Sequence, residues 1–191
     1  MAGNEDDFDW EEVWEGRLER LEEAFGESDD VVLHSPVPFH LGPEVGGAPD
    51  LLRFSQFLDG KLYVTAELTG PGSEQPPNPA GQYELAIVHR GEERWGPNLI
   101  AQLAHYTMES VLDDGETMDI GPAAPEGSTI AGFLFRRIAS FEVLGEAAHV
   151  LCCIGITAEE LAYKHSNGSQ ALVDKLGADF LETDLRRASI V

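Results

Sequence analysis

KLYVTAEL (residues 61–68) and QYELAIVH (residues 82–89) are the two runs that decide the fold of this chain. Their side chains alternate with a period of two, which is typical of a half-buried β-strand. The first run places Leu62, Val64, Ala66 and Leu68 on one face and Tyr63, Thr65 and Glu67 on the other. The bridge TGPGSEQPPNPAG (69–81) holds four prolines and three glycines, which exclude regular structure. The runs are therefore predicted to form a hairpin, or two neighbouring strands, joined by a long exposed loop.

Charge is the most unusual property of the composition. The chain has 191 residues, enough for one domain with a real core, and 35 acids against 12 Lys and Arg give a formal charge of −23. Such a chain repels nucleic acid phosphates and anionic membranes, so the expected partner is a basic protein. The alternative is a solvated acidic surface, as salt-adapted proteins have. The sequence leaves the oligomeric state open.

Location and cysteine chemistry follow from simple patterns. No stretch approaches the ~20 apolar residues of a membrane span, and the acidic start MAGNEDDFDWEE does not look like a signal peptide. A cytoplasmic protein is expected.

Cys152 and Cys153 are adjacent in an apolar run, so they should point to opposite faces of a strand as small core residues. A redox pair or metal site there is a minor alternative.

The segment 1–30 is predicted to carry an acidic amphipathic helix, and 31–191 to form the main domain. Within DWEEVWEGRLERLEEAFG (9–26), apolar residues recur every three or four positions, Asp9 can cap the start and Gly26 can end the helix. We interpret the helix as docking its Trp/Leu/Phe stripe on the core. The alternative is that its acidic outer face mimics a polyanion for a basic partner.

Further elements follow along the chain. VVLHSPVPF (31–39) reads as a short strand that ends at Pro36, and DLLRFSQF (50–57) as a strand or a turn. A helix is expected from an Asn98 N-cap to just before Gly115, with Trp95 packing at its entry. A short strand at TMDIG (117–121) should be followed by a loop.

The C-terminal half predicts two or three more strands in 129–145 and 147–156, the last one central and buried on both faces. Gly132 and Gly155 suggest a bulge or a close backbone approach. Thr157 and Glu160 form a capping box for one helix. A second short helix should be capped by Ser169 and stopped by Gly177.

No catalytic signature is present in the sequence: GxSxG, HExxH, a P-loop, GxGxxG and CxxC are all missing. No catalytic residue, cofactor or metal ligand is therefore expected. Glu67 and Glu84 are unusual because each lies within an apolar run. They should face solvent, meet a buried donor, or contribute to a polar recognition surface. Together with Trp95 they are the candidate partner-binding residues.

The order of several pieces resembles the suppressor-of-fused-like family. They are VVLHSPVPF, DLLRFS, YVTAELTG, QYELAIVHR, WGPNLIAQLAHYT, LDDGETMDIG, STIAGFLF, FEVLG and VLCCIGITAEELAYKHSNGSQALVDKLG. The resemblance implies an α/β (mixed α+β) fold with a mixed, largely antiparallel sheet flanked by helices. It covers about 150 residues and includes no catalytic signature. Unlike the animal members, this chain has room for one domain only.

The resemblance also implies a function. Family members are binding proteins: the animal member restrains a transcription factor, and the bacterial members look like immunity proteins that neutralise toxins. The first hypothesis is a non-enzymatic protein-binding domain that neutralises a basic bacterial toxin. The alternatives are a regulatory adaptor that binds a transcription factor and a hydrolase that uses carboxylates or histidines.

Overall fold

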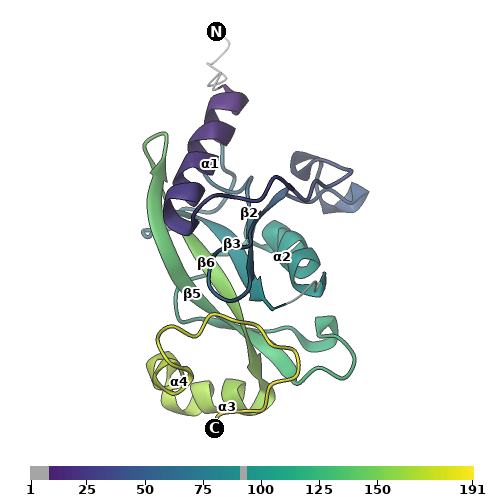
Figure 1. Cartoon of the computed structure of the whole chain (residues 1–191), viewed down its shortest axis with the longest axis vertical. Helices are drawn as coiled ribbons and strands as arrows, with labels where there is room; N and C mark the ends of the chain where they lie inside the picture. Colours follow the sequence, from purple (N-terminus) through teal and green to yellow (C-terminus); the bar gives the residue numbers. More distant parts are fainter. Residues whose placement is uncertain (1–8, 91–93) are drawn as a thin grey trace.

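A six-stranded sheet forms the centre of the computed structural model, which describes residues 9–90 and 94–191 (Figure 1). The strands lie in the order β1-β2-β3-β6-β5-β4. Their bounds are β1 Leu51–Phe54, β2 Lys61–Thr65, β3 Gln82–His89, β4 Thr117–Asp119, β5 Ile130–Val143 and β6 Glu146–Thr157. The helices are α1 Trp10–Phe25, α2 Trp95–Tyr106, α3 Ala158–Asn167 and α4 Ser169–Leu176, with short 3-10 turns at Phe39–Leu41, Pro43–Val45 and Gly121–Ala123. No described helix is long and apolar enough to cross a membrane.

Strand pairing confirms the predicted mixed sheet. The two runs that open the sequence analysis are β2 and β3, and they pair antiparallel with Lys61 opposite His89. β3 and β6 pair in parallel from Gln82 opposite Ala148 to Ala86 opposite Cys152, while the other neighbours in the sheet are antiparallel. β6 therefore occupies the predicted central position, between β3 and β5.

The prediction of half-buried strands is wrong, because both faces of the sheet are covered. Leu62 and Val64 pack in one hydrophobic cluster and Tyr63 in the other, and all three are buried. Leu68 was expected to share a face with Leu62. It belongs instead to the cluster of Tyr63, because β2 ends at Thr65 and the chain turns after it.

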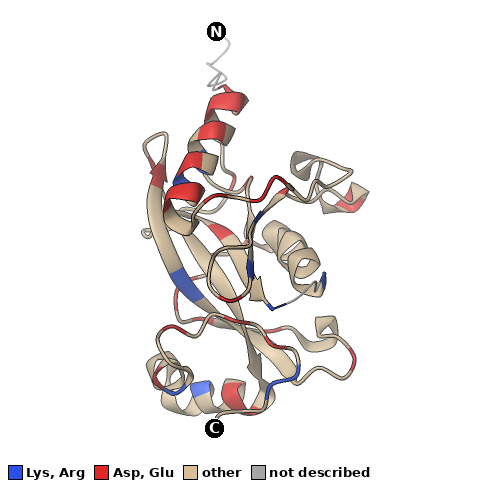
Figure 2. Cartoon of the chain, in the orientation of Figure 1, with Lys and Arg blue, Asp and Glu red and all other residues tan. Residues whose placement is uncertain are grey.

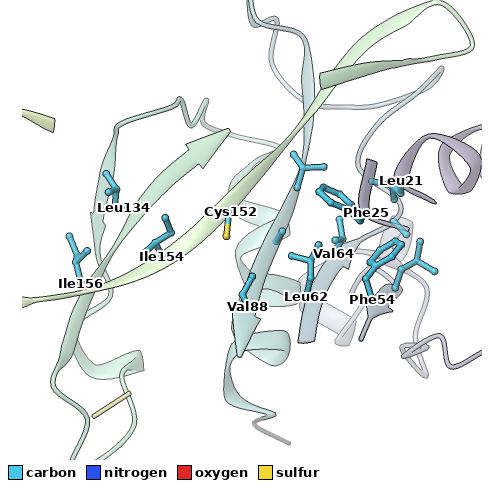
Figure 3. Packing of buried hydrophobic residues seen from close by; sticks show 14 of the residues in the cluster. Leu21, Phe25, Phe54, Leu62, Val64, Val88, Leu134, Cys152, Ile154 and Ile156 are labelled. Carbon is cyan, nitrogen blue, oxygen red and sulfur yellow. The ribbon is translucent and has the colours of Figure 1, made fainter. Parts of the chain in front are cut away.

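Helices cover the two faces unequally. Leu21 and Phe25 of α1 and Leu172 of α4 pack on one face, and Ile100 of α2 packs on the other. Figure 3 shows Leu21 and Phe25 beside strand residues such as Phe54, whose ring centroid lies 5.6 Å from that of Phe25. The α1 helix thus completes the core, as its apolar stripe predicted.

The long hairpin of β5 and β6 confirms the expected roles of its two glycines. Register shifts interrupt the pairing beside Gly132 and between Arg137 and Ala139. A Cβ on Gly132 would lie 2.7 Å from the Met118 carbonyl oxygen, and one on Gly155 would lie 2.7 Å from Thr183. Both positions therefore need a residue without a side chain.

The adjacent cysteines are free and buried, as predicted. Cys152 packs in the cluster of α1 and Cys153 in the cluster of α2, so neighbouring positions of β6 do face opposite sides. Burial raises the pKa of Cys152 to about 12 and that of Cys153 well above its usual value, which makes both thiols poor nucleophiles.

Four local predictions need correction. Residues 31–39 form no strand: Leu33 makes only an isolated bridge to Leu51. The α2 helix begins at Trp95, because Pro97 fits the first helical turn, and Asn98 is not the cap. The same helix ends at Tyr106, well before Gly115. Ser169 lies inside α4 after the capping position Gly168, and its hydroxyl donates to the Gly115 carbonyl.

Other boundary predictions are confirmed. Asp9 caps α1 by accepting from the Glu11 N–H at 2.9 Å, and Gly26 follows its last residue. The capping box of Thr157 and Glu160 is present, and Gly177 ends α4. Residues 50–57 divide into strand β1 and a turn, which settles that alternative. Residues 1–8 of the predicted acidic segment lie outside the described residues.

Candidate functional site

Glu84, the third residue of β3, is fully buried and accepts hydrogen bonds from the chain segment that follows β2. Its Oε1 accepts from the backbone N–H groups of Leu68 and Thr69 and from the Thr69 hydroxyl, each at 2.9 Å. Its Oε2 accepts from the Thr65 hydroxyl at 2.6 Å. The carboxylate therefore fixes the chain where it leaves β2, and it is not available to contact a partner directly.

Arg17 of α1 reaches the same carboxylate. Its Nε lies 3.4 Å from Glu84 Oε1 and 3.0 Å from the Thr69 carbonyl oxygen, to which it donates. Its terminal nitrogens donate to the carbonyls of Ala66 and Thr69. Arg17 is 5% exposed, so this ion pair is closed to solvent and ties α1 to β3.

Burial opposes charge on both members of this pair. It lowers the pKa of Arg17, while the carboxylates of Glu84 and Glu67 work in the opposite direction. Burial likewise raises the pKa of Glu84, and Arg17 and the hydroxyls of Thr65 and Thr69 oppose that rise. A buried pair of this kind is costly to break, because the remaining charge loses its partner inside the protein.

Glu67 lies just beyond this pair and is partly exposed. Its Oε2 accepts from the backbone N–H of Asp50 at 2.8 Å, which joins the segment after β2 to the residue before β1. Burial raises the pKa of Glu67, as does the nearby Asp50. Of the two acids singled out in the apolar runs, only Glu67 offers its side chain to the surface.

Trp95 lies at the other end of β3. Its indole Nε1 donates to the Ala123 carbonyl oxygen at 2.7 Å, and its ring packs near His89 and Phe133. Glu84 and His89 are five residues apart on one strand, which corresponds to about 17 Å. The structure therefore brings Glu67 and Glu84 together around Arg17 and leaves Trp95 apart from them.

Sequence reasoning missed Arg17 as a partner of Glu84. The signal was present, since Arg17 lies on the i, i+4 stripe formed by Val13, Leu21 and Phe25. Trp10, by contrast, contributes little to the buried stripe, since it is 66% exposed. Arg20 pairs within α1, with Glu23 at 2.6 Å.

The irregular C-terminal segment forms a second polar region. Thr183 donates its N–H to the Val88 carbonyl at 2.9 Å, and its hydroxyl accepts from the Gly155 N–H at 2.8 Å. The segment thus lies between the ends of β3 and β6, where those strands no longer pair. The Arg187 side chain donates to both carboxylate oxygens of buried Glu160 and anchors the segment.

A cleft of about 670 Å³ borders this segment and the loop 125–128. It contains a histidine and three acids, which is the arrangement that the hydrolase hypothesis requires. His89 Nδ1 bonds the Thr183 carbonyl oxygen, however, and Glu182 pairs with Arg90 at 2.7 Å. Among the described residues, no group of three His, Cys, Asp or Glu side chains is arranged to hold a metal. Two of these four side chains, His89 and Glu182, are therefore already engaged with other groups of the chain.

Comparison with known proteins connects this geometry to a family. The family described as "Suppressor of fused protein (SUFU)" matches residues 54–188, which is more than two thirds of the chain. The chain belongs to the SUFU family. No curated protein matches it.

Solved structures share the SUFU fold at low sequence identity. A chain of the Sufu-Fu complex superposes with a TM-score of 0.76 at 12% identity, over 93% of this chain and 92% of that one. A SUFU homolog from Neisseria gonorrhoeae gives 0.67 at 19% identity, over 95% of this chain and 98% of that one. Drosophila Suppressor of Fused gives 0.70 at 12% identity, and the match covers 91% of this chain but only half of the Drosophila chain.

Acidic side chains line the outer side of α1 in this SUFU chain (Figure 2). Figure 2 shows acids on successive turns of the helix, and Glu11, Glu12, Glu15, Glu19 and Glu23 are exposed. The buried stripe of the same helix includes Arg17, which leaves Arg20 as the cation on its outer side. The structure therefore separates an inner basic contact, used for folding, from an outer acidic face.

Proposed function

We propose that this chain is a non-enzymatic protein-binding domain that neutralises a basic bacterial toxin in the cytoplasm. The observation that carries the proposal is the acidic outer face of α1 on a SUFU fold. The chain has nearly three acids for each Lys or Arg. Nuclease toxins are basic where they grip phosphates, so the field of this chain steers it towards that surface.

The relatives support the proposal in two ways. One solved neighbour is the Sufu-Fu complex, in which a protein of this fold is bound to another protein. The homolog from Neisseria gonorrhoeae has almost the same extent as this chain. A bacterial domain of nearly the same extent is consistent with the immunity-protein hypothesis, which concerns single-domain bacterial members of the family.

The proposal is tested by co-expressing this chain with the basic protein encoded next to its gene. We expect the toxin alone to arrest growth and co-expression to restore it. The association rate measured by stopped flow should fall roughly tenfold between low and high salt, because screening weakens electrostatic steering. Growth arrest that persists in the presence of this chain would refute neutralisation, and a rate insensitive to salt would refute the electrostatic argument.

A regulatory adaptor is the second candidate. It is favoured by the likeness to Drosophila Suppressor of Fused, although this chain spans only half of that protein. Affinity capture from the native cell distinguishes the two functions. Recovery of a transcription factor, with no effect on toxin-treated cells, would favour the adaptor.

A further inference from the structure

The long strand β5 has an outer edge that the sheet leaves open over its second half. β6 pairs along one side of β5, whereas β4 covers the other side only at Gly132–Leu134. Beyond β4, Gly115 and Glu116 bond the backbone of Phe135, and the Asp114 carboxylate accepts from the Arg137 N–H at 2.8 Å. From residue 138 to residue 143, no described residue forms a hydrogen bond with the outer edge. Figure 1 shows this part of β5 at the border of the sheet, beside α1.

The hairpin turn determines which backbone groups point outward. Leu144 and Gly145 both have positive φ angles, 49° and 90°, as in a two-residue type I′ turn. The pair next to such a turn, Val143 and Glu146, exchanges hydrogen bonds, and bonded and non-bonded pairs then alternate along the strands. The N–H and C=O groups of Ser140 and Glu142 therefore point away from β6, towards the open edge.

A groove of about 500 Å³ runs along this edge. It is formed by Arg20 and Glu23 of α1, Ser140, Phe141 and Glu142 of β5, and Leu144 of the turn. Six residues of strand span about 20 Å, which is long enough for an added strand to form several bonds. The edge contains neither proline nor lysine, which commonly protect open edges, and its one register shift lies at its start, between Arg137 and Ala139.

Leu144 adds an apolar contact at the end of the groove. Its side chain lies close to Gly16 of α1, where an added Cβ would be 3.5 Å from Leu144 Cδ2, and it is still 45% exposed. The exposed part is apolar surface that a partner in the groove can bury.

The charges around the groove select its occupant. Glu23, Glu142 and Glu146 are exposed, and the acidic face of α1 forms the wall. A second copy of this chain would bring the same acids against one another, which is unfavourable. Arg20 also lines the groove, but it is paired with Glu23, so an extended segment that carries Lys or Arg meets a surplus of carboxylates.

We propose that a basic, extended segment of the partner protein adds to the open edge of β5 at residues 138–143 and covers Leu144. The added strand bonds the outward backbone groups of Ser140 and Glu142. This inference rests on the proposed function, since it gives the surface by which a basic partner is held.

The test is amide hydrogen exchange of the full chain by NMR, with a synthetic peptide of alternating lysine and valine as probe. Such a peptide is basic and favours an extended conformation. Exchange at Ser140 and Glu142 should slow roughly tenfold when the peptide binds. Phe141 and Val143, which already bond β6, should change little. Side-chain docking alone would not produce this alternation.

Two pairs of variants sharpen the experiment. Ser140→Pro removes an outward donor without removing a bond to β6 and should abolish the protection, whereas Ser140→Ala should retain it. Leu144→Asn should weaken the peptide roughly tenfold, because a buried leucine is lost. Leu58 also has a positive φ, 60°, and lies in the turn before β2 at the opposite end of the sheet. Leu58→Asn is thus a matched control that should leave the affinity unchanged.

Three results would overturn the inference. The first is failure of the peptide to bind. The second is binding that leaves the amides of Ser140 and Glu142 unprotected. The third is protection of these amides without peptide that grows with protein concentration, which would show a second copy at the edge. A toxin that binds this chain and is neutralised while these amides stay unprotected would refute the site and leave the proposed function intact. Protection of these amides by the peptide, in a chain that fails to rescue growth, would refute the proposed function and leave the site intact.

Discussion

The buried pair of Arg17 and Glu84 is expected to stabilise the fold rather than to bind a partner. Arg17→Met keeps the aliphatic stem of the side chain but leaves a carboxylate that is 0% exposed without its cation. Glu84→Gln keeps the shape and removes the charge opposite Arg17. Breaking a buried ion pair from one side costs about 3–5 kcal/mol, a large part of the 5–15 kcal/mol that stabilises a typical domain.

The two changes should not be additive. In the double variant neither charge is left unpaired, so its loss of unfolding free energy should be smaller than the sum of the single losses by about 1–3 kcal/mol. The free energies are measured by urea unfolding, followed by tryptophan fluorescence, to which Trp14 on α1 contributes. Arg20→Met is the control: Arg20 pairs on the surface with Glu23, and its removal should cost at most about 1 kcal/mol.

Two results would contradict this reasoning. Losses that add fully in the double variant would show that Arg17 and Glu84 do not interact. A Glu84→Gln chain with unchanged stability but weakened partner binding would return Glu84 to the recognition surface.

Three further predictions concern single positions. His149 is buried, with no hydrogen bond of normal geometry from either ring nitrogen to a described residue, and burial lowers its pKa from 6.5 to about 4. Neutral His149 therefore contributes fully to the unfolding free energy above pH 6.5, and this contribution is lost as the pH falls towards 4. The unfolding free energy of His149→Phe, measured in urea titrations, should fall by about 2 kcal/mol less than that of the parent chain between pH 7 and pH 5. Identical losses in both chains would contradict this. Gly96→Ala should lower the melting temperature, because its Cβ would lie 2.0 Å from His89 Nε2 and this clash outweighs the better helix propensity of alanine; a higher melting temperature would show that α2 shifts freely. Leu144→Asn should change the unfolding free energy by less than about 1 kcal/mol in thermal unfolding, because the better tolerance of Asn for a φ of 49° offsets the lost contact of Leu144 with Gly16 of α1; a larger loss would show that this contact dominates.

Local signals predicted the helix ends correctly where a single residue satisfies the unpaired backbone groups at the end of the helix. The cap at Asp9, the capping box of Thr157 and Glu160 and the stop at Gly177 were all correct, because each depends on neighbours within four residues. The predicted helix caps at Asn98 and Ser169 were wrong, although they rested on the same local signals. Both can cap a helix, but the packing of Trp95 and the bond from Ser169 to Gly115 set the actual starts.

The sequence by itself determined the class of fold, the hairpin of β2 and β3, the central position of β6 and the family, since alternation and composition are properties of short stretches. Only the tertiary structure decided that both faces of the hairpin are buried and that Glu84 meets Arg17, 67 residues earlier in the chain. The open edge of β5 was equally invisible to the sequence. Whether a strand has a neighbour depends on where β4 ends in space, and no local pattern in β5 records that.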